Sequence, residues 1–276
     1  MSEIEKLNNY LAKPSPATKR PFSEPTKKAY LSTYNKLTAL LDSNTIYIHS
    51  QKKILHVINN QNQSISTQNS LLNIAIIIRT IYELNTTELA NKRELNKIPL
   101  AAHIASTNES LNLPSYEDLE NYLEILYQKN DYIAYIINYL LINYGVRNQD
   151  VNFDIVLLKR DATDTDINYL WLSKTGKAVW IRRDYKTVGI YGIQTTTIKD
   201  PKFIKMLKKC KNKTLIPHDN NIGLYVKRLT LNEIGEGNYF KILVDYFKTN
   251  LKKLKELSQS RGTSLETIIN NYDINK

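Results

Sequence analysis

The chain has 276 residues, enough for two modest domains, and its 42% hydrophobic fraction is that of a globular protein rather than a disordered one. Lysine and arginine outnumber aspartate and glutamate by 38 to 27, a net charge of +11. This surplus favours a polyanionic partner, and a basic surface kept for solubility is the alternative. The single cysteine, Cys210, excludes an internal disulfide and a multi-cysteine zinc site.

No targeting or membrane segment is visible. The N-terminal "MSEIEKLNNY" is polar, unlike a secretion signal. The most apolar runs, at 71–82 and 132–146, are too short or too interrupted to span a bilayer. We therefore expect an intracellular protein without a membrane partner, in the cytoplasm or nucleus of a host cell or associated with a virion.

Residues 1–24 combine prolines with basic residues. Pro14, Pro16 and Pro21 stand among Lys13, Lys19 and Arg20. This composition predicts a flexible basic arm that lies along a phosphate backbone. An unstructured leader without a role is the alternative.

Helical periodicity begins at Ser23. In "SEPTKKAYLSTYNKLTALL", Tyr30, Tyr34, Leu37 and Leu41 form one apolar face. Further amphipathic patterns follow at 46–58, 68–84 and 87–107. We expect a small helical domain over 25–110, with Lys27 and Lys28 as further contacts to the phosphate backbone.

A second domain is expected over 113–276. Pro114 interrupts the chain, and Ser115 can cap a helix with Asp118 three residues on. The next helix, "DYIAYIINYLLINYGV", is apolar nearly all round and should be the buried centre of this domain.

The pattern changes to β after Asp150. "NYLWLS", "KAVWIRRDY" and "IQTTTI" are rich in β-branched and aromatic residues, with turn signals at 174–176 and 186–192. A helix then starts at Pro201, and the chain ends in helices at 238–258 and 264–271. The predicted fold class is mainly α with a small antiparallel β-sheet, in two domains.

Several chemistries find no support. There is no Gly-rich phosphate loop, and the four histidines are scattered without metal-ligand spacing. We expect neither a metal nor a cofactor.

One set of residues does suggest chemistry. Arg147 follows the buried helix, where a charge is costly unless it has a partner, and Lys186 sits in a predicted β-turn. Asn238 and Lys241 lie one helical turn apart, and Tyr272 comes near the end. Cations together with a tyrosine hydroxyl suit phosphoryl transfer to a protein nucleophile.

In their order along the chain these residues resemble the tyrosine recombinases, the phage-integrase family. "GVRNQD" is similar to the family's G-L-R-x-x-E motif, and Lys186 occupies a β-turn as the family's lysine does. "NYFK" stands where H-x-x-R belongs. "GTSLETIINNY" resembles the closing run, with Thr263 in the histidine position and Tyr272 as the terminal tyrosine.

The resemblance implies a helical core-binding (SAM-like) domain and a catalytic domain that together clamp double-stranded DNA. Tyr272 would form a 3′-phosphotyrosyl link without metal or cofactor. Arg147 and Lys241 would hold the phosphate oxygens, and Lys186 would protonate the leaving oxygen. The family works as tetramers on paired DNA sites, in integration, excision or resolution, and is typical of viruses and mobile genetic elements.

The sequence departs from the family at Asn238, Lys241 and Thr263. Asparagine cannot shuttle protons, and lysine lacks the planar two-point grip of arginine. Arg261 could restore a guanidinium as a further DNA contact. These departures leave open a recombinase-fold protein that binds DNA without cleaving it, and a DNA-relaxing enzyme similar to type IB topoisomerases.

Each site residue also has a structural alternative. Arg147 could pair with Asp150, and Lys174 or Lys177 could be the turn lysine instead of Lys186. Asn238 and Lys241 could be an ordinary exposed helix start, and Tyr272 could anchor the terminal helix through its ring.

Overall fold

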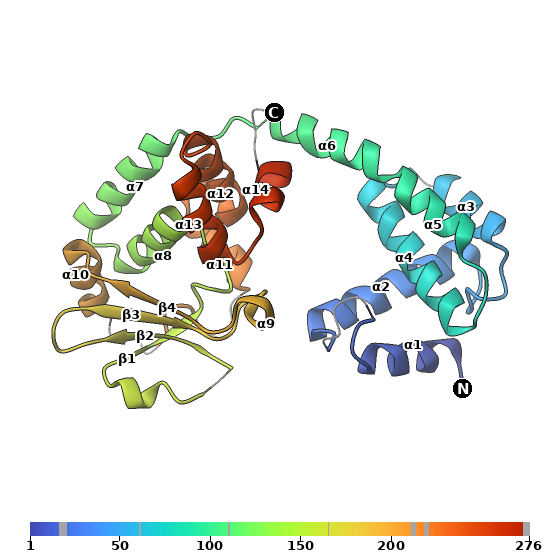
Figure 1. Cartoon of the computed structure of the whole chain (residues 1–276), viewed down its shortest axis with the longest axis horizontal. Coiled ribbons are helices and arrows are strands. Elements are labelled where there is room, and N and C mark those ends of the chain that lie inside the picture. The colour runs from blue at the N-terminus through green and yellow to red at the C-terminus, as the bar shows by residue number, and fades with distance from the viewer. Residues whose placement is uncertain are drawn as a thin grey trace. The chain divides into compact units, whose positions relative to one another are not determined.

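The computed structural model describes residues 1–16, 21–60, 62–109, 111–164, 166–210, 214–217 and 221–272. It divides into two units, Met1–Ile104 and Ala105–Lys276, and the small sheet belongs to the second (Figure 1). The division falls inside a helix, a few residues before the boundary expected from the sequence. Among the described helices, none combines the length and the hydrophobicity that crossing a bilayer requires.

The first unit is helical. Its helices are α1 (Glu3–Ala12), α2 (Glu24–Leu41), α3 (Gln51–Asn60), α4 (Ile65–Ile81), α5 (Thr87–Leu95) and the first part of α6 (Lys97–Glu109). The side chains of Ser23 and Ser64 cap α2 and α4 by accepting a hydrogen bond from a backbone N–H of the first turn. The single helix expected at 87–107 is two helices, because Pro99 lacks an N–H and its ring would clash with the carbonyl of Leu95 in a continuous helix.

The first half of the predicted flexible arm is a helix instead. Ser2 and Glu5 form a capping box at the start of α1, and Leu7 and Leu11 are buried in the core of the first unit. The carboxylate of Glu3 is only 3% exposed and accepts hydrogen bonds from the N–H groups of Ile46 (2.8 Å) and Tyr47 (2.9 Å). The prediction of an arm was wrong for these residues, because the apolar face of α1 is covered by helices far along the chain.

Leu7→Ala should therefore lower the free energy of unfolding by about 2–5 kcal/mol, because it leaves a cavity in a packed core. Ile4→Ala on the same helix is the matched control, since Ile4 is 39% exposed. It should cost less than about 1 kcal/mol. Urea titration of both variants measures the difference, and equal, small effects would mean that α1 is not part of the core.

The second unit is mainly helical with one sheet. It contains α7 (Tyr116–Gln128), α8 (Tyr132–Tyr144), β1 (Phe153–Val156), β2 (Asn168–Leu172), β3 (Ala178–Arg182), α9 (Val188–Tyr191), β4 (Gln194–Ile198), α10 (Pro201–Lys209), α11 (Ile222–Leu229), α12 (Gly235–Tyr246), α13 (Leu251–Arg261) and α14 (Leu265–Tyr272), with short 3-10 turns at Lys159–Asp161 and Leu231–Glu233. The predicted capping box of Ser115 and Asp118 is confirmed at the start of α7. The helix expected at 238–258 is divided, and the side chain of Asn250 caps the start of α13.

The sheet is mixed rather than antiparallel. Its strand order is β1-β2-β3-β4, with β1 parallel to β2 and the other neighbours antiparallel. Strand β1, which has only four residues, was not predicted from the sequence. The segment 157–167 returns the chain to the end of the sheet where β1 began, and this produces the parallel pair.

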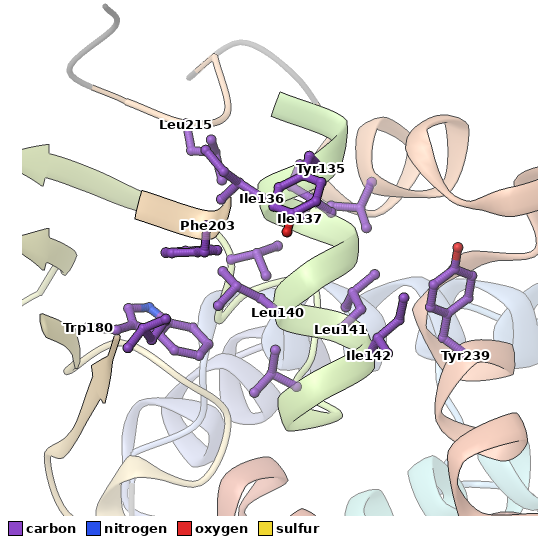
Figure 2. Packing of buried hydrophobic residues seen from close by; sticks show 14 of the residues in the cluster. Tyr135, Ile136, Ile137, Leu140, Leu141, Ile142, Trp180, Phe203, Leu215 and Tyr239 are labelled. Carbon is purple, nitrogen blue, oxygen red and sulfur yellow. The ribbon is translucent and has the colours of Figure 1, made fainter. Parts of the chain in front are cut away.

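Helix α8 is the centre of the second unit, as predicted. Its residues from Ala134 to Ile142 are almost all buried. Figure 2 shows Trp180 and Phe203 packed on one side of α8 and Tyr239 on another. The sheet and the C-terminal helices are therefore both positioned by this helix.

One polar side chain of α8 is fully buried. Asn138 donates hydrogen bonds to the carbonyls of Ala134 (2.7 Å) and Leu229 (2.8 Å) and accepts one from the hydroxyl of Tyr239 (2.6 Å). Tyr239 in turn accepts one from the N–H of Leu231 (2.8 Å). This chain of bonds joins α8 to α12 and to the end of α11.

Asn138→Leu should lower the free energy of unfolding by about 2–3 kcal/mol, because it leaves the buried hydroxyl of Tyr239 without its acceptor and removes the shorter of two hydrogen bonds to the carbonyl of Leu229, the other coming from Tyr122. Asn143→Leu provides the control, because Asn143 is exposed on the same helix and its side-chain amide donates to the carbonyl of Tyr139 within that helix. Its effect should stay within about 0.5 kcal/mol. Thermal and urea unfolding compare the two variants. An unchanged free energy of unfolding in Asn138→Leu would contradict a stabilising role for the network.

Candidate active site

The site begins where α8 ends. Gly145 closes the helix in the left-handed conformation (φ +60°), and a Cβ there would lie 2.8 Å from the ring of Phe240. Glycine is therefore required both by the backbone and by the space. The chain turns here and places Arg147 just outside the helix. The Asp150 carboxylate holds this turn by accepting the N–H of Arg147 at 2.7 Å.

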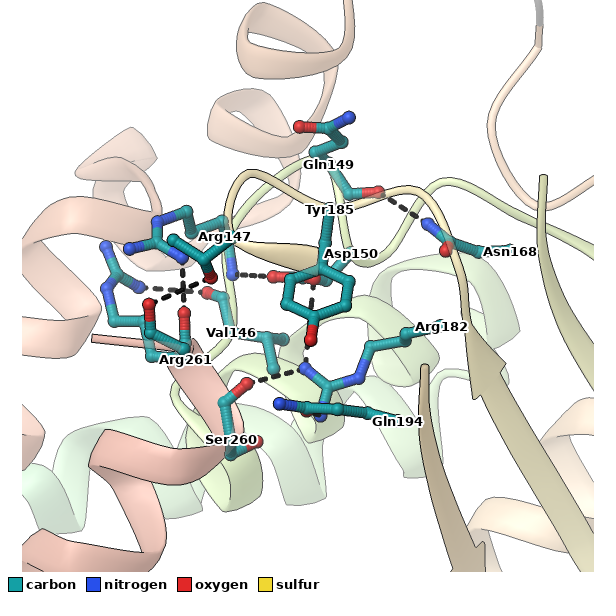
Figure 3. A network of polar contacts seen from close by, with 12 residues as sticks. Val146, Arg147, Gln149, Asp150, Asn168, Arg182, Tyr185, Gln194, Ser260 and Arg261 are labelled. Atoms are coloured by element: carbon teal, nitrogen blue, oxygen red, sulfur yellow. Dashed lines mark hydrogen bonds and ion pairs between the residues drawn. The ribbon is translucent and has the colours of Figure 1, made fainter. Parts of the chain in front are cut away.

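Arg261, the last residue of α13, is bound to this turn. Its guanidinium donates to the carbonyls of Gly145 (2.9 Å) and Val146 (3.1 Å) and pairs with Glu236 at 3.0 Å. Its own carbonyl accepts a hydrogen bond from the guanidinium of Arg147 (Figure 3). Hydrogen bonds from both arginines thus join the end of α13 to the segment after α8, although the two are far apart in the sequence.

Tyr272 reaches the same region from α14. Its ring meets that of Phe240 edge to face, with centroids 4.8 Å apart. The guanidinium carbon of Arg261 lies 4.0 Å from the centroid of the Phe240 ring and 5.2 Å from that of Tyr272. The predicted Arg147 and Tyr272 therefore lie beside one common residue, Arg261.

Charge in this region is partly desolvated. Burial lowers the pKa of the half-buried Arg147, and so does Arg261, while Asp150, Tyr272 and Glu236 oppose this shift. Arg147 remains a cation, because arginine deprotonates only at very high pH, and a partly desolvated cation favours an anion such as a phosphate.

Lys186 lies in the connection between β3 and β4, at the end of the sheet that faces this site. On either side of it, Tyr185 donates to the carbonyl of Gly192 (2.5 Å) and Thr187 to the carbonyl of Gly262 (2.9 Å). Gly262 is left-handed (φ +61°), and a Cβ there would overlap Thr187. The exposed Lys186 therefore sits on a loop that is fixed against the residue after Arg261.

Lys174 and Lys177 lie elsewhere. They flank the turn between β2 and β3, at the opposite end of β3 from Arg182. Arg182 lies at the end of β3 that is nearer to the site. Its guanidinium donates to the carbonyl of Ser260, the residue before Arg261, at 2.6 Å. Of the three turn lysines considered from the sequence, Lys186 is the one whose loop contacts the region of Arg261.

The remaining predicted site residues, Asn238, Lys241 and Thr263, make their hydrogen bonds away from Arg147 and Tyr272. The side-chain amide of Asn238 donates to the carbonyl of Ile234 in its own helix (3.0 Å). Lys241 is half-buried, and burial lowers its pKa. Thr263 binds Ser258 through its backbone, donating to the carbonyl and accepting from the hydroxyl. In the described part of the chain, no hydrogen bond or ion pair joins these three side chains to Arg147 or Tyr272.

The residues predicted to contact DNA differ in their exposure. Lys13 and Lys28 are exposed, and Lys27 pairs with Glu24 at 2.6 Å. Lys19 and Arg20 lie outside the described residues. Arg261 was expected to face DNA and is instead 2% exposed. Its guanidinium is used internally, because the carbonyls after α8 and the carboxylate of Glu236 require a buried donor.

A second buried pair, beneath the site, was not predicted from the sequence. Arg182 and Asp150 are each 1% exposed, with 3.8 Å between Arg182 Nη1 and Asp150 Oδ1. Burial raises the pKa of the Asp150 carboxyl, while Arg182 and the N–H of Arg147 oppose this shift. Figure 3 shows Arg182 reaching both Ser260 and Gln194. The adjacent arginines of "IRRDY" were the only sequence signal, and nothing in them distinguished the buried one.

Within the described residues, no group of three histidine, cysteine, aspartate or glutamate side chains could hold a metal ion. Comparison with family models, with curated proteins and with solved structures found no match for this chain.

Arg261→Met should lower the free energy of unfolding by about 3–5 kcal/mol, because it leaves Glu236 without its buried partner. Adding Glu236→Met should recover part of this loss, since the uncompensated charge is then removed. Arg228→Met is the control, because Arg228 is exposed in the same unit. Urea titration measures these variants and Glu236→Met alone. Strictly additive losses in the double variant would contradict the pairing.

Proposed function

We propose that this protein binds duplex DNA and cleaves and rejoins it through a tyrosine, as a strand transferase of the tyrosine-recombinase type. The observation that carries the proposal is the convergence of Arg147 and Tyr272 on Arg261. The net charge of +11 supports a polyanionic partner. The helical first unit corresponds in this proposal to the core-binding domain and the second unit to the catalytic domain.

In the proposed reaction, the phenol oxygen of Tyr272 attacks the phosphorus of a DNA phosphodiester. The bond from phosphorus to the 5′-oxygen breaks, and a 3′-phosphotyrosyl bond forms in its place. Tyr272 loses its proton to solvent water, and Lys186 supplies a proton to the leaving 5′-oxygen. Because one phosphoester replaces another, attack by a 5′-hydroxyl can reverse the step and rejoin the DNA.

Arg147 would stabilise the negative charge that develops on the phosphate. Its backbone is held by Asp150 and one of its side-chain N–H groups by the carbonyl of Arg261, so the guanidinium is oriented before DNA binds. Lys241 would add a second positive charge, without the two-point contact of an arginine. Asn238 and Thr263 would contribute hydrogen bonds but no proton transfer. Tetramers on paired DNA sites and a role in DNA integration belong to the same proposal.

A second candidate is a protein of the same fold that binds or organises DNA without cleaving it. The observation that favours it is the internal use of Arg261, which leaves the site with Lys241 where the family has a second arginine. A weaker third candidate is sequence-independent DNA relaxation by nicking, because similar residues would serve it.

Incubation with a nicked suicide duplex separates these candidates. For strand transfer, the wild-type protein should form a covalent protein–DNA adduct, and Tyr272→Phe should form none. DNA affinity should be unchanged, and the free energy of unfolding should stay within about 0.5 kcal/mol, because the ring and its packing on Phe240 remain. Tyr246→Phe is the control, since Tyr246 is an exposed tyrosine of the same unit.

The outcomes point in different directions. DNA binding without an adduct in the wild-type protein would favour the second candidate. Relaxation of supercoiled DNA of any sequence would favour the third. An adduct on another tyrosine would remove Tyr272 from the mechanism.

A further inference from the structure

A groove lined by lysines lies at the end of the sheet away from the candidate active site. Lys199, Lys205, Lys208 and Lys209 line it together with Gly176 of the β2–β3 turn, and its volume is about 570 Å³. We call it the lysine groove. Figure 1 shows α10, which carries most of these residues, and α9, near the candidate site, at opposite ends of the sheet.

No acidic side chain among the described lining residues neutralises the positive charge of the lysine groove. Lys205 donates to the hydroxyl of Tyr127 (3.1 Å) and Lys209 to the side-chain carbonyl of Asn130, and both partners are neutral. Two carboxylates of the neighbouring elements are already engaged: Glu124 pairs with Lys202, and Asp200 accepts the N–H of Phe203 as the cap of α10.

Crowding like charges in this way is unfavourable. Lysines one turn apart on a helix repel each other by a few tenths of a kcal/mol per pair. Lys205 and Lys208 are such a pair, and Lys174 and Lys177 add two exposed cations at the neighbouring turn. A polyanion in the groove would remove this repulsion and release its own counterions.

The geometry favours a phosphate backbone over a membrane surface. The apolar side of α10 is buried, because Phe203, Ile204, Met206 and Leu207 belong to the core of the second unit. The helix therefore offers a bilayer no apolar face to insert. What remains outside on α10 is the set of ammonium groups of Lys205, Lys208 and Lys209, over roughly 6 Å of helix at 1.5 Å per residue.

We propose that the lysine groove binds the phosphate backbone of duplex DNA outside the reacting phosphate. The whole of β3 separates it from Arg182 and the candidate site, roughly 13 Å at about 3.3 Å per residue. Such contacts fix the position of DNA on the protein and carry no base specificity. The proposal rests on the proposed function only in taking DNA as the partner and requires no cleavage.

The test compares two triple variants of the full chain. The first, Lys199→Gln, Lys205→Gln and Lys208→Gln, removes three charges from the groove. The second, Lys227→Gln, Lys252→Gln and Lys255→Gln, removes three exposed charges elsewhere in the same unit. Affinity for a short fluorescein-labelled duplex is measured by anisotropy over a series of NaCl concentrations.

The groove variant should bind roughly tenfold more weakly or worse at low salt. The slope of log K against log salt should fall in magnitude by about 2–3, close to 0.9 for each phosphate that the variant no longer neutralises. The control variant should change both quantities much less. Equal changes in the two variants, or no change in either, would overturn the proposal.

Two further measurements separate DNA from a lipid surface, and binding in the groove from cleavage. Weaker binding of the groove variant to phosphatidylserine vesicles, with an unchanged DNA slope, would overturn DNA as the partner of the groove. The yield of covalent adduct at saturating DNA should be unaffected by the groove variant. A missing adduct in the wild-type protein overturns only the cleavage reaction, whereas an unchanged slope in the groove variant overturns only the groove.

Discussion

The buried guanidinium of Arg261 is the interaction on which the candidate site depends. A charge that is 2% exposed is tolerated only with partners, and here they are two backbone carbonyls and the carboxylate of Glu236. The carbonyls belong to the turn that presents Arg147, and Glu236 belongs to α12, on which Tyr272 packs through Phe240. One side chain therefore ties together the segments that carry the proposed cation and the proposed nucleophile.

The same arrangement explains why two glycines are needed. Gly145 and Gly262 end α8 and α13 in left-handed conformations, and both have neighbours where a Cβ would stand. These close approaches let the two helix ends meet and let the loop of Lys186 rest on Gly262 through Thr187. The site is thus built mainly from helix ends and one hairpin loop, placed around the core helix α8.

The local features of this fold were readable from the sequence, and the long-range ones were not. The apolar run of α8, the capping box at Ser115 and three strands follow from periodicity and capping chemistry. The anchoring of α1 depends on Glu3 binding N–H groups more than forty residues away, which no local pattern reports. The burial of Arg261 was missed for the same reason, since "SRGTS" looks like an exposed helix end. The order of Arg147, Lys186 and Tyr272 along the chain indicated these residues as site candidates. It did not predict that a buried Arg261 would contact the segments that carry Arg147 and Tyr272.

In the proposed reaction, one phosphate meets both Arg147 and the residue at position 272. A crystal structure of the Tyr272→Phe variant bound to duplex DNA would test this arrangement. We expect a single phosphate whose oxygens lie about 3 Å from the Arg147 guanidinium, with the ring of residue 272 facing the phosphorus. A duplex bound across another face, with no phosphate at Arg147, would contradict it.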